Sequence, residues 1–175
     1  DAGHDHVCAT RPRDDDRLYV IDSHGALSEW DRSDPQHPRR VRYLDSFRAG
    51  GPITEAPDLT ISPDGRFLVT AMQENALHGW KLDGKPGEEA RHMRMTGYPA
   101  KIKSLSWAPK GKWLASSGAP AAIVWPFSAK DGPMGKAPME LGTRANILVT
   151  SVAFHPAEEV LAIGFIDGMI LGVRL

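Results

Sequence analysis

The sequence has almost no cysteine, with one Cys in 175 residues. A single thiol excludes an intramolecular disulfide framework and a four-thiolate zinc site. Charge of one sign is also not in excess, because 21 Lys and Arg stand against 22 Asp and Glu, a formal net charge of -1. This balance argues against nucleic acid as a partner, since nucleic-acid binding relies on excess positive charge.

Long apolar runs are missing as well. The most apolar stretch, Val160 to Leu175, is interrupted by Asp167 and Gly168 and is shorter than the roughly 20 residues of a membrane-spanning helix. The chain begins Asp1-Ala2-Gly3-His4, without Met and without the apolar region of a signal peptide. We therefore expect no membrane partner and a cytoplasmic location.

What the sequence does contain is a repeat. Four segments share a turn with proline, an apolar run, a tight turn and a second run that closes near an aromatic residue. Successive prolines of the pattern lie 51, 46 and 47 residues apart, and the closing positions follow them by 18, 17, 16 and 17 residues. The segments are Arg11-Pro12 to Trp30, Ser62-Pro63-Asp64-Gly65 to Trp80, Ala108-Pro109-Lys110-Gly111 to Trp125, and His155-Pro156 to Val173.

Each repeat predicts short antiparallel strands. Ser62-Pro63-Asp64-Gly65 is typical of a β-turn, and Asp167-Gly168 is typical of a two-residue hairpin. Three strands per unit are expected at 59–61, 67–71 and 77–82, then at 104–107, 113–116 and 122–125, and at 152–154, 160–163 and 169–173. More polar segments at 41–47, 91–95 and 139–141 supply a fourth strand. The sequence therefore predicts an all-β fold of four-stranded antiparallel units.

In its repeats the chain resembles the WD40-repeat β-propeller family, as divergent, bacterial-type repeats. The resemblance is carried by the stretch from Ser62 to Leu68, by Trp30-Asp31 and by Gly3-His4. It divides the chain into blade-like units at about 1–47, 48–96, 97–142 and 143–175. Such propellers usually close with about seven blades, whereas 175 residues divided by a period of about 47 give about 3.7. We expect an incomplete propeller, completed by the remainder of the same chain or by a second copy.

The resemblance also assigns structural positions. In blades of this family, hydrogen bonds join the histidine of a Gly-His pair, a hydroxyl on a strand, an Asp and the Trp. In this chain only the first unit has candidates for the histidine, the Asp and the Trp, namely His4, Asp22 and Trp30. We therefore expect packing to depend more on apolar contacts than on polar sets. The expected structural positions are Trp30, Trp80, Trp125, Pro63, Asp64, Gly65, Asp22, Asp167 and Gly168.

The resemblance implies a non-catalytic scaffold that binds proteins through loops and needs no cofactor. Loops at 48–55, 98–103 and 144–147 are expected on one face, and the Ser62–Gly65 type of turn on the other. The candidate interaction residues are Arg48, Tyr98, Lys101, Lys103, Trp113, Arg144 and Asn146.

Two alternatives are weighed against the scaffold. His4, His6, Cys8 and His24 gather imidazole and thiol ligands that suit zinc, which would make the chain a metal-handling module, although structural roles are favoured. A propeller hydrolase would need carboxylates in the inner strands, and the sequence has neither these nor a Gly-x-Ser-x-Gly motif. The stretch 132–136 resembles a phosphate loop only in composition and is expected to connect blades.

Overall fold

The computed structural model describes residues 7–12, 16–22, 26–45, 59–71, 74–83 and 91–175. All regular secondary structure in these ranges is β-strand. The strands are β1 (Val7–Pro12), β2 (Arg17–Asp22), β3 (Leu27–Asp31), β4 (Arg39–Asp45), β5 (Leu59–Ile61), β6 (Phe67–Ala71), β7 (Leu77–Lys81), β8 (Arg91–Met95), β9 (Leu105–Trp107), β10 (Trp113–Ser116), β11 (Ala122–Pro126), β12 (Met139–Leu141), β13 (Val149–Phe154), β14 (Val160–Phe165) and β15 (Ile170–Arg174).

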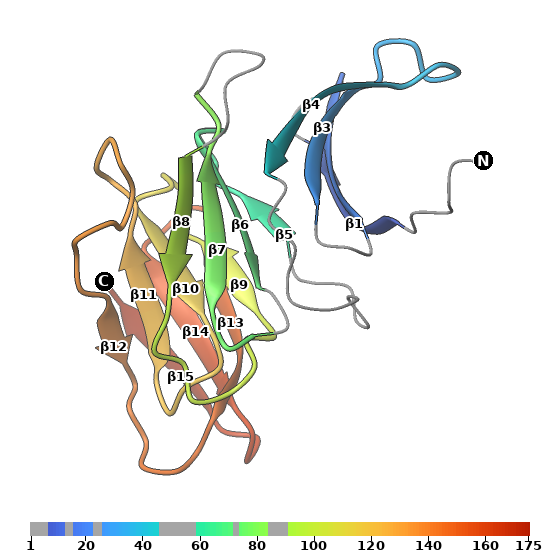
Figure 1. Ribbon diagram of the computed structural model, residues 1–175. Helices are drawn as coiled ribbons and strands as arrows, with labels where there is room; N and C mark the ends of the chain where they lie inside the picture. The colour runs from blue at the N-terminus through green and yellow to red at the C-terminus, as the bar shows by residue number, and fades with distance from the viewer. Residues whose placement is uncertain (1–6, 13–15, 23–25, 46–58, 72–73, 84–90) are drawn as a thin grey trace.

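Strands that are consecutive in the chain pair side by side and antiparallel, so that each sheet is a simple meander (Figure 1). The first sheet holds β1 to β4, the second β5 to β8 and the third β9 to β12. The fourth sheet holds β13, β14 and β15 among the described residues. The all-β prediction with antiparallel units is confirmed.

One cross-strand pair recurs at the same register in every sheet. In three sheets, a leucine of the second strand pairs with a tryptophan of the third strand. In the fourth sheet, the leucine pairs with a valine. The pairs are Leu18 with Trp30, Leu68 with Trp80, Leu114 with Trp125, and Leu161 with Val173. Because a one-residue slip would move every side chain to the opposite face, this shared register makes residues of different sheets directly comparable.

The hydrophobic core lies between neighbouring sheets. Between the second and third sheets, Phe67 and Val69 pack in one cluster with Leu114, Trp125 and Phe127. The rings of Phe67 and Phe127 meet edge to face, with centroids 5.2 Å apart. A second cluster lies between the third and fourth sheets. The third sheet contributes the smaller residues Ala115, Ala122 and Val124, and the fourth contributes the larger residues Leu161, Ile163 and Phe165. The second, third and fourth sheets therefore bury apolar faces against one another.

The Ser62–Gly65 turn is closed by its own side chains. Ser62 Oγ donates to Oδ1 of Asp64 at 2.6 Å and accepts from the amide of Phe67 at 3.0 Å. The amide of Gly65 donates to the Ser62 carbonyl at 2.8 Å, and its φ of 71° is a conformation that favours glycine. Gly111 repeats this geometry in the next sheet, with φ 67°. The Ser62–Gly65 turn is thus stabilised by hydrogen bonds among residues close together in the sequence.

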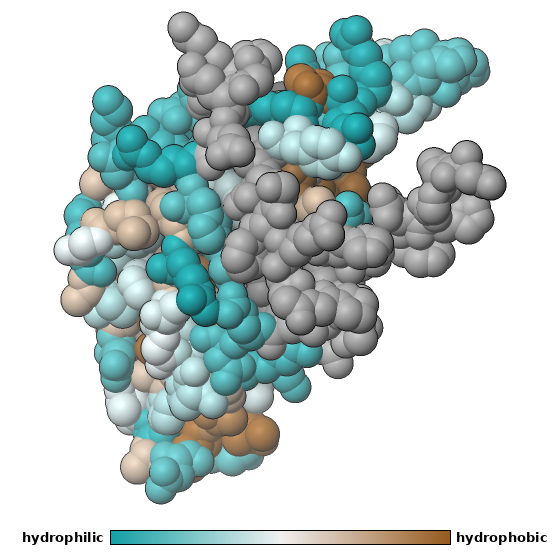
Figure 2. All heavy atoms as spheres, in the orientation of Figure 1, coloured by the Kyte–Doolittle hydropathy of each residue, from teal (hydrophilic) through white to brown (hydrophobic). Residues whose placement is uncertain are grey.

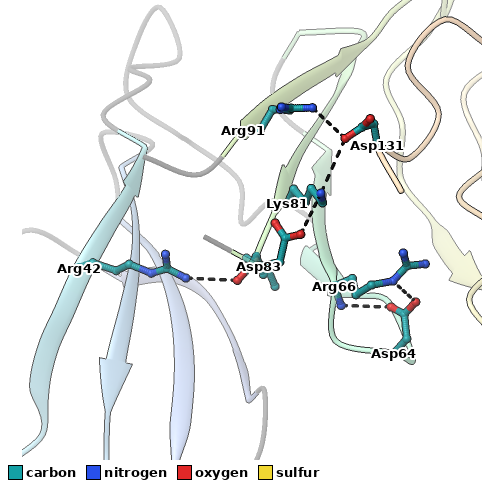
Figure 3. Close-up of polar contacts among 8 residues, drawn as sticks. Arg42, Asp64, Arg66, Lys81, Asp83, Arg91 and Asp131 are labelled. Carbon is teal, nitrogen blue, oxygen red and sulfur yellow. Dashed lines mark hydrogen bonds and ion pairs between the residues drawn. The ribbon is translucent and has the colours of Figure 1, made fainter. Parts of the chain in front are cut away.

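The loop between β11 and β12 corrects one prediction. Residues 132–136 were expected to connect blades, but they lie between two strands of the same sheet. The loop instead contacts the second sheet, where Asp131 Oδ1 lies 2.8 Å from Nη1 of Arg91 and 3.7 Å from Nζ of Lys81 (Figure 3). A side chain at Gly132 would meet Sδ of Met93 at 3.2 Å. Turn residues predict where the chain turns, but not which strands the turn joins.

A buried polar set accompanies the apolar packing in the third sheet. The indole of Trp125 donates to the hydroxyl of Tyr98 at 2.6 Å, which also shares a hydrogen bond of 2.6 Å with Oγ of Ser116. Ser116 donates in turn to the carbonyl of Ile123 at 3.2 Å. The sequence held a signal for this set, because Gly97-Tyr98 occupies the place of a Gly-His pair, with an aromatic hydroxyl in place of the imidazole.

The first sheet has hydrogen bonds at two of the structural positions that the resemblance assigns, Trp30 and Asp22. The Trp30 indole donates to Oγ of Ser28 at 2.8 Å, so the strand hydroxyl comes from a neighbour on β3. Asp22 accepts the amide of Ala26 at 2.9 Å. His4 lies outside the described residues.

Candidate functional site

Four loops of the third and fourth sheets form one surface, which we call the loop face. Its segments are 96–104, 117–121, 142–148 and 166–169. Backbone hydrogen bonds hold them together: Gly118 accepts from Ala100 at 3.1 Å, and Pro120 accepts from Arg144 at 2.9 Å. The amide of Ile166 donates to Leu148 at 2.9 Å. The loop face is therefore a fixed surface built from segments far apart in the sequence.

Gly118 makes the close approach of these loops possible. Its φ is +95°, and a Cβ at this position would lie 3.0 Å from the carbonyl oxygen of Ala100. A side chain here would push apart the loops that follow β8 and β10.

The loop face carries an exposed apolar patch at the turn between β14 and β15. Ile166, Met169 and Ile170 are 67%, 42% and 76% exposed. Figure 2 shows hydrophobic atoms at the lower end of the molecule, over the part of the fold where this turn lies in Figure 1. Exposed apolar side chains that gather in one place are typical of binding surfaces.

A fixed ion pair borders the apolar patch. Nη1 of Arg144 lies 2.7 Å from Oδ2 of Asp167, and its guanidinium lies over the Phe165 ring, 5.0 Å from the centroid. The hydrogen bond from Arg144 and the amide of Met169 lower the pKa of Asp167. Asn146 is exposed with φ 61°, a backbone conformation that few residues other than glycine and asparagine adopt. Arg144 thus borders the patch, and Asn146 lies in the same loop, while the interaction role of both stays a prediction.

Lys101 and Lys103 add positive charge to the same face. Lys103 is exposed and its amide donates to Oγ of Ser117 at 3.0 Å, whereas Lys101 is half-buried. The backbone of Lys103 is therefore fixed to the loop that follows β10.

Tyr98 does not belong to this surface. It is only 7% exposed, and burial raises the pKa of its hydroxyl to about 12. The prediction of an interaction residue is wrong here, because the hydroxyl is used inside the third sheet by Trp125 and Ser116.

Trp113 also differs from its predicted role as an exposed contact residue. Its ring is half-buried against the cluster between the third and fourth sheets, and Nζ of Lys112 lies 5.2 Å from the ring centroid. Its indole nitrogen is buried without a hydrogen-bond partner among the described residues. The bulk of Trp113 thus serves packing between sheets.

The predicted metal ligands cannot be brought together from the described part of the chain. Three of the predicted ligands lie outside the described residues: His4, His6 and His24. The fourth, Cys8, is placed only by its backbone in β1. The interaction candidate Arg48 also lies outside the described residues. Within the described ranges, no group of three or more His, Cys, Asp or Glu residues could hold a metal ion. The same ranges contain no helix long and apolar enough to span a membrane.

Two histidines of the second sheet form a cluster that the sequence reading missed. Nδ1 of His78 lies 2.8 Å from Nε2 of His92, and the other nitrogen of His78 is hydrogen-bonded to Glu74. Glu74 also pairs with Arg94. The side chain of His78 is fully buried, and this burial lowers its pKa, although the hydrogen bond to Glu74 opposes the shift. Neutral His78 is therefore the form that the fold stabilises.

Acidification is expected to destabilise the protein through His78. Its pKa is lowered from 6.5 on folding, so below pH 6.5 the unfolded chain binds the proton more tightly and the free energy of unfolding falls. Urea denaturation at several pH values between 6.5 and 4.5, the ordinary pKa values of His78 and Glu74, measures the slope. His78→Gln should have a shallower slope in this window than the original chain. Equal slopes would contradict the assignment.

The fourth sheet has one uncovered face. Ala162 and Gly172 on this face are exposed, and Ile170 is 76% exposed. Their register equivalents in the third sheet, Ala115, Val124 and Ala122, are fully buried by the fourth sheet. The fourth sheet thus presents, uncovered among the described residues, the kind of face that a neighbouring sheet covers elsewhere in the chain.

Comparison with known families identifies the repeat. Residues 91–125 match the family model of the WD domain, G-beta repeat. The chain thus contains a stretch similar to a WD40 repeat. The matched WD40 repeat runs from β8 to β11, so it begins in the second sheet and ends in the third. No curated protein matches the sequence.

A solved β-propeller domain has a similar fold. The chain is similar to the crystal structure of the Cps50 (Swd1) β-propeller domain of Myceliophteria thermophila, with a TM-score of 0.65 and 14% sequence identity. The alignment covers 90% of this chain and 49% of that chain. The chain therefore spans about half the length of this propeller, and the prediction of a β-propeller fold is confirmed.

Proposed function

We propose that this chain is a non-catalytic scaffold that binds a protein partner through its loop face. The observation that carries the proposal is the exposed group of Ile166, Met169 and Ile170 beside the ion pair of Arg144 and Asp167. An apolar centre with a polar border is the usual composition of a protein interface. Lys101 and Lys103 favour a partner with acidic side chains around an apolar anchor.

The scaffold function predicts that Ile166→Glu weakens recovery of the partner by at least about fivefold, because a buried apolar anchor contributes more than 1 kcal/mol to binding. The measurement is quantitative recovery of bound proteins from the source cell on the immobilised chain. Met134→Glu is the matched control, since Met134 is 51% exposed but lies in the loop between β11 and β12. Equal recovery by the Ile166→Glu and Met134→Glu variants would refute the proposed surface.

We also propose that further propeller sheets, from the remainder of the same polypeptide or from a second copy, cover the face formed by Ala162, Gly172 and Ile170. The support is the register equivalence of these residues with the buried Ala115, Val124 and Ala122. Mass measurement of the natural protein distinguishes the two sources, because the first requires a longer chain and the second a dimer.

A further inference from the structure

The turns at the end of the sheets opposite the loop face form a second surface, which we call the turn face (Figure 1). In the second and third sheets its segments are 62–66, 82–83, 108–112 and 127–138. The turns 62–66 and 108–112 lie side by side, because a Cβ at Gly111 would lie 3.4 Å from Cδ of Pro63. The loop 127–138 begins beside them, where the amide of Phe127 donates to the carbonyl of Lys112 at 2.8 Å. The turn face is thus one surface that extends over two sheets.

Positive charge is concentrated on this part of the turn face. Its described segments, with the adjoining strand ends of β7 and β8, contain three carboxylates and seven cations. The carboxylates are Asp64, Asp83 and Asp131, and the cations are Arg66, Lys81, Arg91, Lys110, Lys112, Lys130 and Lys136. The whole chain has a formal net charge of -1, so this excess is a local feature.

Ion pairs use all three carboxylates. Oδ2 of Asp64 lies 2.7 Å from Nε of Arg66, and Oδ2 of Asp83 lies 2.8 Å from Nζ of Lys81. Asp131 pairs with Arg91 and Lys81, as Figure 3 shows.

Four lysines therefore account for the excess of positive charge. Within the described ranges, no ion pair involves Lys110, Lys112, Lys130 or Lys136, and all four are exposed. Lys130 lies close enough to Asp83 to lower its pKa, but the larger cause is the hydrogen bond from Lys81. The unpaired ammonium groups are thus available to a partner.

The loop that carries Lys130 and Lys136 is held in place. Asp131 fixes it to the second sheet, and a Cβ at Gly132 would lie 3.2 Å from Sδ of Met93. The amide of Lys136 donates to the carbonyl of Pro133 at 3.0 Å. Figure 2 shows hydrophilic atoms where this loop lies in Figure 1. A fixed backbone lowers the entropy that is lost when a partner binds.

The kind of cation indicates the kind of anion. Every arginine of this surface is paired with a carboxylate, and the unpaired cations are lysines. Lysine is a point charge and lacks the planar fork with which arginine binds phosphate through two hydrogen bonds. The carboxylates of Asp64 and Asp83 also repel a continuous phosphate backbone. Separate carboxylate side chains on a flexible polypeptide can pair with the lysines and avoid these two groups.

We propose that the turn face of the second and third sheets binds an acidic polypeptide segment, whose Asp or Glu side chains pair with Lys110, Lys112, Lys130 and Lys136. Single exposed ion pairs contribute little, so the affinity depends on several pairs that form together. This surface lies at the opposite end of the sheets from the loop face and does not depend on the function proposed there. A chain with both surfaces can hold two partners at once.

The test uses a fluorescein-labelled peptide in which Glu and Ser alternate, and fluorescence anisotropy at low ionic strength. Saturable binding is expected, which added salt weakens. The same peptide with Gln in place of Glu should not bind. Lys110→Glu and Lys136→Glu should each weaken binding by at least about threefold, because each removes an ion pair and adds a like charge. Lys103→Glu is the matched control, since it changes the net charge equally on the loop face and should leave the affinity nearly unchanged.

Three results would overturn the proposal. The first is no binding of the Glu peptide, and the second is an equal loss of affinity in Lys103→Glu, which would indicate a response to net charge alone. The third is tighter binding of a single-stranded oligonucleotide or of phosphatidylserine vesicles than of the peptide, which would assign the surface to phosphate groups.

Two further variants separate this surface from the loop face. Ile166→Glu should leave binding of the acidic peptide unchanged. Met134→Glu places a negative charge in the loop between Lys130 and Lys136 and should weaken it. In the recovery experiment from the source cell, a protein lost with Met134→Glu but kept with Ile166→Glu belongs to the turn face, so either surface can fail without the other.

Discussion

Arg42→Met is expected to lower the free energy of unfolding by about 3–5 kcal/mol, the usual cost of removing one partner of a buried ion pair. Nε of Arg42 lies 2.7 Å from Oε2 of Glu29, and the two side chains are only 7% and 5% exposed. Nη2 of Arg42 also reaches the carbonyl of Leu82 at 3.5 Å, in the second sheet (Figure 3). Without Arg42, the Glu29 carboxylate is buried without its cation.

Urea denaturation monitored by tryptophan fluorescence measures this change. Arg39→Met is the matched control on the same strand, because Arg39 is 81% exposed and its removal should leave the stability nearly unchanged. Replacing Glu29 as well, by Met in an Arg42→Met background, should restore part of the loss. A variant at Arg42 that is no less stable than the variant at Arg39 would show that the pair does not stabilise the first sheet.

The second large effect is expected at Tyr98. Tyr98→Phe should lower the free energy of unfolding by about 2 kcal/mol, because it leaves the buried indole N–H of Trp125 without its acceptor and removes a partner of Ser116. Tyr43→Phe is the control, since Tyr43 is 53% exposed, and it should have almost no effect. Thermal unfolding of both variants under one condition provides the comparison, and equal melting temperatures would contradict the structural role.

The hydroxyl of Tyr98 also predicts a spectroscopic result. Its raised pKa of about 12 means that it stays protonated when exposed tyrosines ionise near their ordinary value of 10.0. In ultraviolet titration of the folded protein, Tyr98 should therefore contribute a late ionisation step. In Tyr98→Phe the amplitude of the late step should be smaller by one tyrosine.

Local signals in the sequence predicted much of this fold. The turn at Ser62–Gly65 is fixed by hydrogen bonds within a few residues, and the strands on either side of it lie where the apolar runs predicted. The equivalence of Trp30, Trp80 and Trp125 is likewise visible in their spacing, and the register confirms it. Features that depend on residues close together in the sequence, such as this turn, can be predicted from a single sequence.

Contacts between distant segments could not be found in this way. The partners of Tyr98 lie 18 and 27 residues away, so its burial depends on how the loop after β8 folds onto β10 and β11. Trp113 is covered by the fourth sheet, and the loop after β11 is held by Lys81 and Arg91 of the second. In each case the side chain's environment is set by a neighbouring sheet, which local patterns do not specify.

The offset between the matched repeat and the sheets has an evolutionary consequence. Residues 91–125 begin with β8, the outer strand of the second sheet, and continue with β9 to β11 of the third. If a unit that starts at β8 is duplicated or lost, the sheet next to the boundary receives the outer strand of another unit in place of its own. The sheets on either side of the event still have four strands, and no half-built sheet results. A unit gained or lost at this boundary would therefore change the number of sheets by one.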